Sequence, residues 1–598
     1  MRLRYRGADT GGLRLPSAVR WRVCAEAPAL LLALVFFCAA ALAHPAHAGK
    51  KKQPDEAPGG SGDSAKSGTA AAGSVSGAAP QAPKPGKLQH FDIDEYRVEG
   101  ADTLPQIEVE EAVYPFLGPR RTPEDVEKAR AALEKTYHDK GFQAVSVAIP
   151  EQDPRNGIVI LKVTENRIGR TRVMGARYFE PSQIKKKAPS LAEGTVPNFN
   201  SVTKDIVALN QWPDRRVTPA LRAGATPGTV DVDLNVEDKL PVHASAELNN
   251  RQSPSTEPLR QSVTFSYANL WQLGHSLSFT YQVSPQNPSN VEVFSGSYLA
   301  RLPENDFTSL LLYGLKSESN VATVGGLTVV GPGQIVGARA IFTLPARESF
   351  YHTASVGLDY KSFGQVVLTS AGDITFSTPV TYYPLVANYT ATWVSETSLM
   401  QLNAGVTAGF RGIGSSPAFF DAKRFGADEN FIHFNGDFSR LQTLPIGFQV
   451  FGRVQGQVTN QPLVSSEQFP LGGLDTVRGY LESEVLGDNG FAATVELRSP
   501  NINEAIGAWV KDNAGEPPVP NLFNDWRFFG FVDGGGAYIL EPLPEQLSRF
   551  YLWSYGTGAR VKLTDHFNGM VVFAVPMISQ VYTKARDPRV LFRIWGEF

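Results

Sequence analysis

The feature of this sequence that most limits its fold is a series of sixteen segments, from Val242 to the last residue, in which apolar and polar side chains alternate. In Ser276–Val283, for example, Leu277, Phe279 and Tyr281 share one face, while serine, threonine and glutamine fill the other. Successive side chains of a strand point to opposite faces, so a period of two predicts β-strands. Runs of about ten such residues are typical of a transmembrane β-barrel, although a soluble β-sandwich alternates similarly. The predicted strands begin near residues 242, 259, 275, 291, 307, 334, 350, 379, 397, 433, 447, 489, 526, 550, 567 and 589.

The connections between these segments favour the barrel over the sandwich. Those after even-numbered strands are mostly short, as in Gln272–Gly274, whereas those after odd-numbered strands are often long, as in Ser319–Gly333 and Gly412–Ile432. Short turns at one rim and long loops at the other are typical of outer-membrane barrels. The long connection Asn501–Asp525 is an exception on the short side. We therefore predict a 16-stranded antiparallel transmembrane β-barrel at residues 240–598.

The amino terminus is predicted to be an export signal covering residues 1–48. Six arginines precede an apolar run, Ala27–Ala43, and small residues at Ala46 and Ala48 fit an A-x-A cleavage site. A membrane anchor is the alternative. Both cysteines, Cys24 and Cys38, fall within this signal, so the mature chain is expected to hold no disulfide and no thiolate metal site. Residues 49–87, rich in Gly, Ala, Ser, Pro and Lys, are expected to form a flexible leader.

Between leader and barrel, two small α+β domains with the order βααββ are predicted at residues 88–166 and 167–239. The clearest helix begins after Thr122, the predicted N-cap, with Pro123 at the first helical position, and ends at Gly141. The apolar face of this helix comprises Val126, Ala129, Leu133 and Tyr137. In the first domain, the predicted strands are Phe91–Val98, Ala144–Ile149 and Ile158–Thr164, with a further helix at Ile107–Phe116. In the second, the elements are the strands Ile168–Val173, Arg216–Leu221 and Thr229–Val236 and the helices Pro181–Lys187 and Val202–Trp212.

Composition argues against several classes of function. The net charge of −3 gives no strong attraction to nucleic acid. The nine histidines are scattered, and the sequence contains no H-E-x-x-H and no G-x-S-x-G motif. We therefore expect no enzymatic activity, no metal and no cofactor. A passive porin would not need the two preceding domains.

Two short stretches late in the strand series form the candidate site. The first, Gly472–Tyr480, places an arginine at a glycine turn, and the second, Phe531–Gly535, places an aspartate on a strand. A guanidinium offers a rigid fork of donors that a carboxylate accepts in two parallel bonds. The alternative is an arginine in solvent and an unrelated strand-end aspartate. The candidate residues are Val477, Arg478, Gly479 and Tyr480 in the loop, and Phe531, Asp533 and Gly535 on one face of the strand.

Alternation in the preceding strand adds a second carboxylate. Phe491, Ala493, Val495 and Leu497 are predicted to face lipid, which turns Glu496 toward the barrel interior. Gly535 is expected to leave room for the backbone of the loop to approach.

Val477-Arg478-Gly479-Tyr480 resembles the V-R-G-Y loop motif of two-partner secretion transporters, and Phe531–Gly535 resembles their F-x-D-x-G strand motif. The two βααββ modules resemble POTRA domains, and the terminal Phe598 resembles an outer-membrane assembly signal, so the likeness covers about residues 88–598. It implies that a loop around 461–488 folds into the barrel, where its arginine meets acidic groups. It also implies an outer-membrane location with residues 49–239 in the periplasm.

The resemblance implies a function in protein secretion. Members of this family export haemolysins and filamentous adhesins, and their POTRA domains receive unfolded polypeptides. The expected partners are an unfolded exoprotein, outer-membrane lipid and lipopolysaccharide, and the barrel-assembly machinery during biogenesis. The alternative function is an assembly factor of the same superfamily, although such factors usually carry more POTRA domains. An amino-terminal plug helix, frequent in the family, is not expected in residues 49–87.

One strand of the second POTRA-like domain is the candidate for binding the exoprotein. An extended peptide can add to an exposed sheet edge through main-chain hydrogen bonds. Arg216–Leu221 contains Pro219, which cannot donate to a strand ladder and therefore suits an edge. The residues proposed for this edge are Arg216, Val217, Thr218, Ala220 and Leu221.

Overall fold

The computed structural model describes residues 90–598 except 154–155, 213, 303–306, 320, 325–326, 365, 369–373, 378 and 504–522. The predicted signal and leader, and most of the connection Asn501–Asp525, lie outside the described residues. Those that are described all belong to one of the chain's two compact units, Lys87–Phe598. No helix among them is both long and apolar enough to cross a membrane.

The first α+β domain differs from the prediction at its start. The predicted strand Phe91–Val98 is two strands, β1 (Phe91–Ile93) and β2 (Glu95–Glu99). They separate because the backbone amides of Asp94 and Glu95 both donate to the Gly157 carbonyl, at 2.8 and 3.1 Å. β2 pairs parallel to β5 (Ile158–Glu165), which pairs with β4 (Val145–Ala148), while β1 pairs with the unpredicted β3 (Gly118–Arg121).

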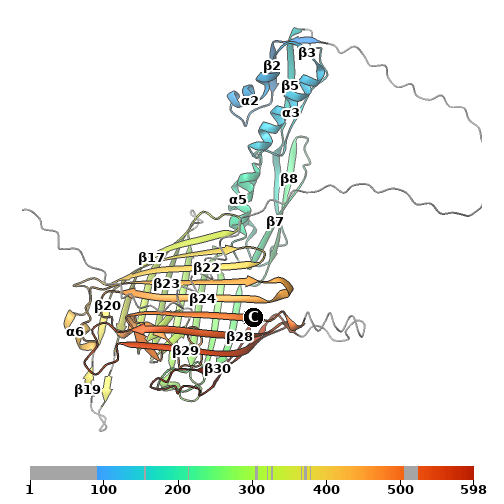
Figure 1. Cartoon of the computed structure of the whole chain (residues 1–598). Coiled ribbons are helices and arrows are strands. Elements are labelled where there is room, and N and C mark those ends of the chain that lie inside the picture. Colours follow the sequence, from blue (N-terminus) through green and yellow to red (C-terminus); the bar gives the residue numbers. More distant parts are fainter. Residues whose placement is uncertain are drawn as a thin grey trace, which may run out of the picture. The chain divides into compact units, whose positions relative to one another are not determined.

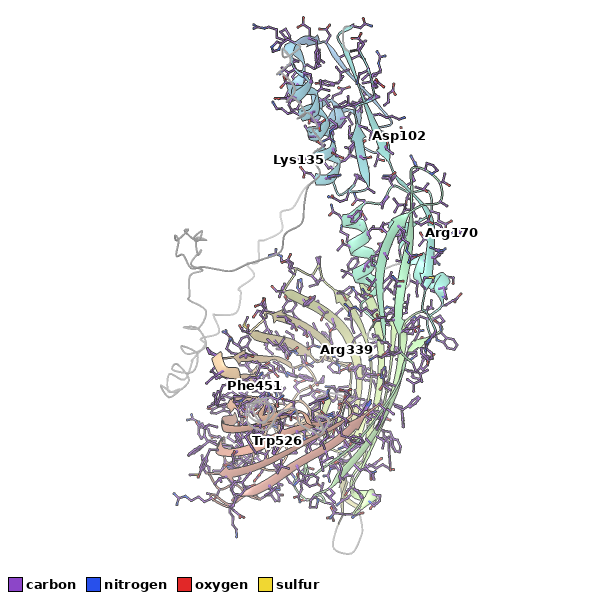
Figure 2. All side chains as sticks on the ribbon, turned by 90° about the vertical axis from the view of Figure 1, so that its right-hand side faces the viewer. Asp102, Lys135, Arg170, Arg339, Phe451 and Trp526 are labelled. Carbon is purple, nitrogen blue, oxygen red and sulfur yellow. The ribbon has the colours of Figure 1, made fainter. Side chains whose placement is uncertain are left out.

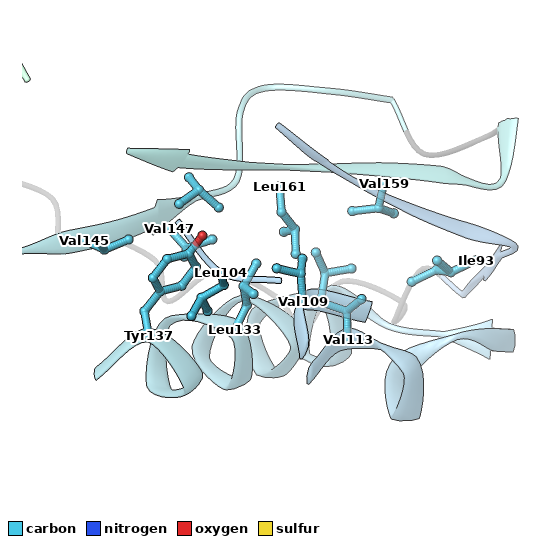
Figure 3. Close-up of a cluster of buried hydrophobic side chains, with 12 residues drawn as sticks. Ile93, Leu104, Val109, Val113, Leu133, Tyr137, Val145, Val147, Val159 and Leu161 are labelled. Atoms are coloured by element: carbon cyan, nitrogen blue, oxygen red, sulfur yellow. The ribbon is translucent and has the colours of Figure 1, made fainter. Parts of the chain in front are cut away.

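Two helices cover the three-stranded sheet of this domain, α2 (Gln106–Val113, followed by η1, Tyr114–Phe116) and α3 (Pro123–Asp139). α3 confirms its predicted start, because Thr122 and Asp125 form a reciprocal capping box. The predicted apolar face is also confirmed, since all four of its residues are buried. Figure 3 shows Leu133 directed from the helix toward Leu161 of the sheet, and Tyr137 directed toward Val145 and Val147.

The second domain contains a sheet in the order β6–β8–β7, made of β6 (Arg167–Met174), β8 (Thr229–Asp238) and β7 (Arg215–Ala223). Its helices are α4 (Pro181–Lys186), η3 (Pro189–Leu191) and α5 (Phe199–Leu209). α5 begins three residues before the predicted Val202 because the Asn198 side chain caps it, accepting from the amides of Asn200 and Ser201. It ends before the predicted Trp212.

The sixteen-stranded antiparallel barrel is confirmed, and each strand begins within three residues of its predicted start. β31 pairs with β9 and closes the barrel. β20 and β21 both pair with β17 and are two parts of one strand, interrupted at Tyr383 and Pro384. The strands are β9 (Val242–Asn249), β10 (Arg260–Leu270), β11 (His275–Val283), β12 (Glu292–Arg301), β13 (Thr308–Ser317), β16 (Gly333–Thr343), β17 (Phe350–Phe363), β20 (Val380–Tyr382) with β21 (Leu385–Val394), β22 (Ser398–Ala408), β23 (Ile432–Thr443), β24 (Gln449–Thr459), β27 (Asn489–Arg498), β28 (Phe523–Tyr538), β29 (Arg549–Leu563), β30 (Phe567–Pro576) and β31 (Arg589–Glu597).

Alternation sorts the side chains of these strands onto two faces. Leu277 and Phe279 of β11, like Val532 of β28, are about half exposed, as expected for a surface that meets lipid. Polar networks lie on the other face. In one of them, Arg339 of β16 donates to Asp359 and to the Tyr313 hydroxyl, at 2.9 and 2.7 Å. Side chains project from both faces of the ribbon in Figure 2, where Arg339 is labelled.

Three of the long connections contain elements that the sequence did not predict. Two hairpins, β14–β15 and β18–β19, follow β13 and β17 in the chain, and a short helix, α6, lies between β22 and β23; β19 and α6 are labelled in Figure 1. Their bounds are Val321–Val324 and Leu327–Val330, Val366–Leu368 and Ile374–Ser377, and Pro417–Lys423.

Candidate functional site

The loop that connects β24 to β27, residues 460–488, holds the first candidate motif. We call it the in-folding loop, because its apolar side chains are buried against the inner face of the barrel wall. Its two arms form a short hairpin, β25 (Phe469–Leu471) with β26 (Val485–Gly487). Its buried residues pack with three small or apolar side chains of neighbouring strands, Ala492 of β27, Ala537 of β28 and Leu552 of β29.

Arg478 lies at the centre of the site and contacts both predicted carboxylates. Its Nε and Nη2 donate to the two oxygens of Asp533 at 2.7 and 2.8 Å, which is the bidentate arrangement expected of a guanidinium and a carboxylate. The Arg478 backbone amide donates to Asp533 Oδ2 at 3.1 Å. Its Nη1 donates to Glu496 Oε2 at 2.8 Å. We call these three residues the arginine lock.

The three residues of the arginine lock are buried. Arg478 is 4% exposed, Glu496 1% and Asp533 0%. The guanidinium carbon of Arg478 lies 3.5 Å from the ring centroid of Phe531, so the ring covers one face of the cation. Burial by itself lowers the pKa of Arg478, but the hydrogen bonds and charges of Asp533 and Glu496 outweigh it and raise that pKa above its ordinary value. Arg478 therefore stays charged.

The two carboxylates of the lock have different sets of partners. Glu496 also accepts hydrogen bonds from two arginines of the wall, Arg498 Nε at 2.7 Å and Arg560 Nη2 at 3.3 Å, and Arg560 Nη1 lies 2.9 Å from Glu496 Oε1. In the described part of the chain, every hydrogen bond to the Asp533 carboxylate comes from Arg478. Departure of the loop would therefore leave Glu496 paired and Asp533 without a partner.

The other predicted loop residues fix the backbone around Arg478. Val477 is fully buried, and the Tyr480 hydroxyl donates to the Ile578 carbonyl at 2.9 Å and accepts from the Ile578 amide at 3.0 Å. Gly479 has a φ of +94°, and a Cβ there would lie 3.3 Å from the Cβ of Ala574 in β30. Both the conformation and the close approach favour glycine.

Gly535 differs from its prediction in one respect. The element that approaches it is the side chain of Leu471, not the backbone of the loop. A Cβ at position 535 would lie 2.7 Å from Leu471 Cδ1 and 2.6 Å from the Phe491 carbonyl oxygen. The absence of a side chain at Gly535 thus lets the hairpin of the in-folding loop rest against β28.

Three contacts of the in-folding loop were not found from the sequence. Arg251, between β9 and β10, donates to Glu482 at 2.9 Å and to Asp475 at 2.6 Å. Asp488 accepts from Arg424 Nη2 at 2.6 Å, and Glu467 accepts from three side chains of the wall. Asp475 lies in the stretch Gly472–Tyr480, but the other residues belong to no recognisable motif, so spatial proximity alone reveals these contacts.

The candidate exoprotein-binding strand is the outer strand of its sheet. β7 pairs with β8 alone among the described strands, and Pro219 lies within it. An apolar pocket of about 220 Å³ lies between β7 and α5. Pro219 and Leu221 line it from the strand, and Val202, Ile206 and Val207 line it from the helix.

Family models match two parts of the chain. Residues 228–510 match the haemolysin secretion/activation protein ShlB/FhaC/HecB, and residues 91–166 match the POTRA domain, ShlB-type. The outer membrane transporter CdiB of Dickeya dadantii (strain 3937) is 23% identical over 468 residues, which cover 75% of this chain and 76% of that protein.

Solved structures share the fold at low sequence identity. CdiB from Escherichia coli has a TM-score of 0.59 and 18% identity, and the match covers 87% of this chain and 93% of that chain. CdiB from Acinetobacter baumannii has a TM-score of 0.55 and 15% identity, covering 86% and 91%. BamA from Haemophilus ducreyi lacking POTRA domains 1–3 has a TM-score of 0.51 and 11% identity, covering 86% and 100%.

The closed barrel and the two matched models define an outer-membrane transporter that carries POTRA domains. The chain belongs to the two-partner secretion transporter family, the haemolysin secretion/activation proteins ShlB/FhaC/HecB. It is an outer-membrane protein whose POTRA domains lie in the periplasm. Transporters of this family act with secreted exoprotein partners.

Proposed function

We propose that this transporter binds an unfolded exoprotein in the periplasm and passes it through its own barrel to the cell surface. The observation that carries the proposal is the arginine lock, in which a loop inside the barrel is held by one buried cation on two wall carboxylates. A loop fixed at one place by charged hydrogen bonds can occupy the channel at rest and move when a polypeptide enters.

The lock is suited to reversible release because the wall is largely paired without it. Glu496 keeps Arg498 and Arg560 as partners when Arg478 leaves, so Asp533 is the wall carboxylate that loses its partner. The sixteen strands satisfy their backbone groups with one another and do not depend on the loop. The barrel can therefore persist while the loop moves.

We further propose that the exoprotein is captured at β7 of the second POTRA-like domain. An extended segment added to β7 would pair with the backbone of Arg216–Leu221. Alternate side chains of the added strand would lie on the face that carries Pro219 and Leu221, over the apolar pocket. The occupant that fits is an unfolded polypeptide with alternating apolar residues, since the edge supplies main-chain bonds and the pocket accepts apolar side chains.

A charge placed in this pocket is expected to weaken secretion. Val207 lies on α5, is 57% exposed and lines the pocket, so Val207→Glu should leave the domain folded while placing a carboxylate where apolar side chains bind. We expect secreted exoprotein to fall about tenfold, since an unpaired polar group against an apolar contact costs about 1–3 kcal/mol. The measurement is exoprotein in the medium at matched transporter levels.

The matched control is Ser201→Glu. Ser201 is an exposed residue of the same helix and does not line the pocket, so this variant adds the same charge elsewhere. Normal secretion by Val207→Glu, or an equal loss in Ser201→Glu, would contradict capture at this site.

A further inference from the structure

We propose that the in-folding loop is fastened at a second place, separate from the arginine lock, where Glu467 is held by Lys361, Tyr382 and His433. We call these four residues the Glu467 clamp. The proposal assigns Glu467 as a positioning residue for the loop. It rests on the proposed function in one respect, that the loop is the part that moves during transport.

The clamp joins one loop residue to three strands of the barrel. Glu467 Oε1 accepts from Lys361 Nζ of β17 at 2.6 Å and from the Tyr382 hydroxyl of β20 at 2.5 Å. Glu467 Oε2 lies 3.1 Å from His433 Nε2 of β23. The Glu467 side chain is only 3% exposed. A carboxylate this deeply buried needs compensating partners, and these three supply them.

The clamp and the lock act on different parts of the loop and on different parts of the wall. Glu467 is in η6 (Ser465–Glu467), before the β25–β26 hairpin, whereas Arg478 lies beyond β25. The lock uses β27 and β28, and the clamp uses β17, β20 and β23. No residue is shared, so each can open without the other.

The surrounding hydrogen bonds hold the His433 ring in place. Gln457 Nε2 donates to the backbone carbonyls of Glu467 and Asp488, which leaves Gln457 Oε1 to accept from Asn435 Nδ2 at 3.3 Å. Asn435 therefore presents Oδ1 to His433 Nδ1, at 2.7 Å. The His433 ring is therefore held from both sides, by Asn435 at Nδ1 and by Glu467 at Nε2.

The partners of Glu467 keep its carboxylate ionised. Burial raises the pKa of Glu467, but the charges and hydrogen bonds of Lys361 and His433 outweigh it and lower that pKa to about 2. The carboxylate therefore stays ionised until the pH falls toward that value. The groups that face this carboxylate are Lys361, Tyr382 and His433.

Hydrogen exchange of the full-length protein in detergent, without exoprotein, tests the clamp directly. In Glu467→Gln, which keeps the side-chain shape, we expect amide exchange in residues 463–471 to rise about ten- to a hundredfold while residues 474–482 keep their protection. In Arg478→Ala, we expect the opposite pattern. Lys361→Gln should reproduce the effect of Glu467→Gln by removing a partner instead of the carboxylate.

The matched control is Asp428→Asn. Asp428 pairs with Arg411, which is mostly exposed, on the chain that leads into β23, and neither residue contacts the in-folding loop among the described interactions. This variant should leave exchange in both segments unchanged. Unchanged exchange in 463–471 in both Glu467→Gln and Lys361→Gln would overturn the proposal. Release of both segments together by either clamp variant would show a single cooperative unit and would also overturn it. Because no exoprotein is present, these outcomes stand apart from whether the protein translocates a partner.

Discussion

Replacing Arg478 with alanine is expected to abolish or sharply reduce secretion while the barrel remains folded in the outer membrane. The substitution removes four hydrogen bonds from a site where Arg478 is only 4% exposed. One of these, from the backbone amide, is lost because the loop segment moves. Removing one member of a buried ion pair costs about 3–5 kcal/mol, which corresponds to more than a hundredfold shift in where the loop lies.

A lysine at position 478 tests whether a positive charge alone, without the planar guanidinium, is enough to hold the loop. Arg478→Lys keeps a cation but cannot make the bidentate contact with Asp533 together with the contact to Glu496. We therefore expect poor rescue. Secreted exoprotein at matched transporter levels is the measurement, and heat-modifiable mobility on gels is the folding control. Full secretion by Arg478→Ala would disprove the role of the lock in transport. Failure of this variant to fold would show that Arg478 is needed for assembly of the barrel instead of for transport.

The two carboxylates of the lock are expected to give different defects. Asp533→Ala should match Arg478→Ala, because the described bonds to Asp533 all come from Arg478. The double variant should be little worse than either single one, since both remove the same interaction. Glu496→Gln instead leaves the bidentate pair of Arg478 and Asp533 intact, but it removes the carboxylate with which Arg498 and Arg560 pair.

Glu496→Gln should therefore lower the stability of the barrel wall more than it weakens the attachment of the in-folding loop. We expect the barrel to lose its heat-modifiable resistance at a lower temperature, while secretion per folded molecule falls only severalfold. Asp533→Ala should show the reverse, with normal heat resistance and little secretion. Equal secretion and equal heat resistance in the two variants would contradict the division of partners seen around the lock.

Much of the barrel could be predicted from the sequence because alternation is a local property of each strand. The starts of all sixteen strands were predicted within three residues. The hairpins β14–β15 and β18–β19 were not predicted, because strands of three or four residues are too short to show a period. β1 and β2 were merged for a related reason. Their separation depends on hydrogen bonds to Gly157, more than sixty residues away in the chain.

The candidate site was predictable only where it carries a motif. Arg478 and Asp533 lie in recognisable stretches, and strand alternation placed Glu496 on the same face of the wall, where the structure brings all three together. Glu467 had no such signal. Its partners Lys361, Tyr382 and His433 are 106, 85 and 34 residues away, and only closure of the barrel brings them together.

The most direct test of the account is to tether the in-folding loop to the wall and then release it. Leu474 of the loop and Met570 of β30 both pack against the same buried cluster of the barrel wall, so cysteines at these two positions can be joined by a thiol cross-linker that reduction cleaves. The only native cysteines, Cys24 and Cys38, lie in the predicted signal. We predict that the tethered transporter, inserted and folded, secretes no exoprotein, and that reduction restores secretion. Normal secretion with the tether intact would contradict movement of the loop as a step in transport.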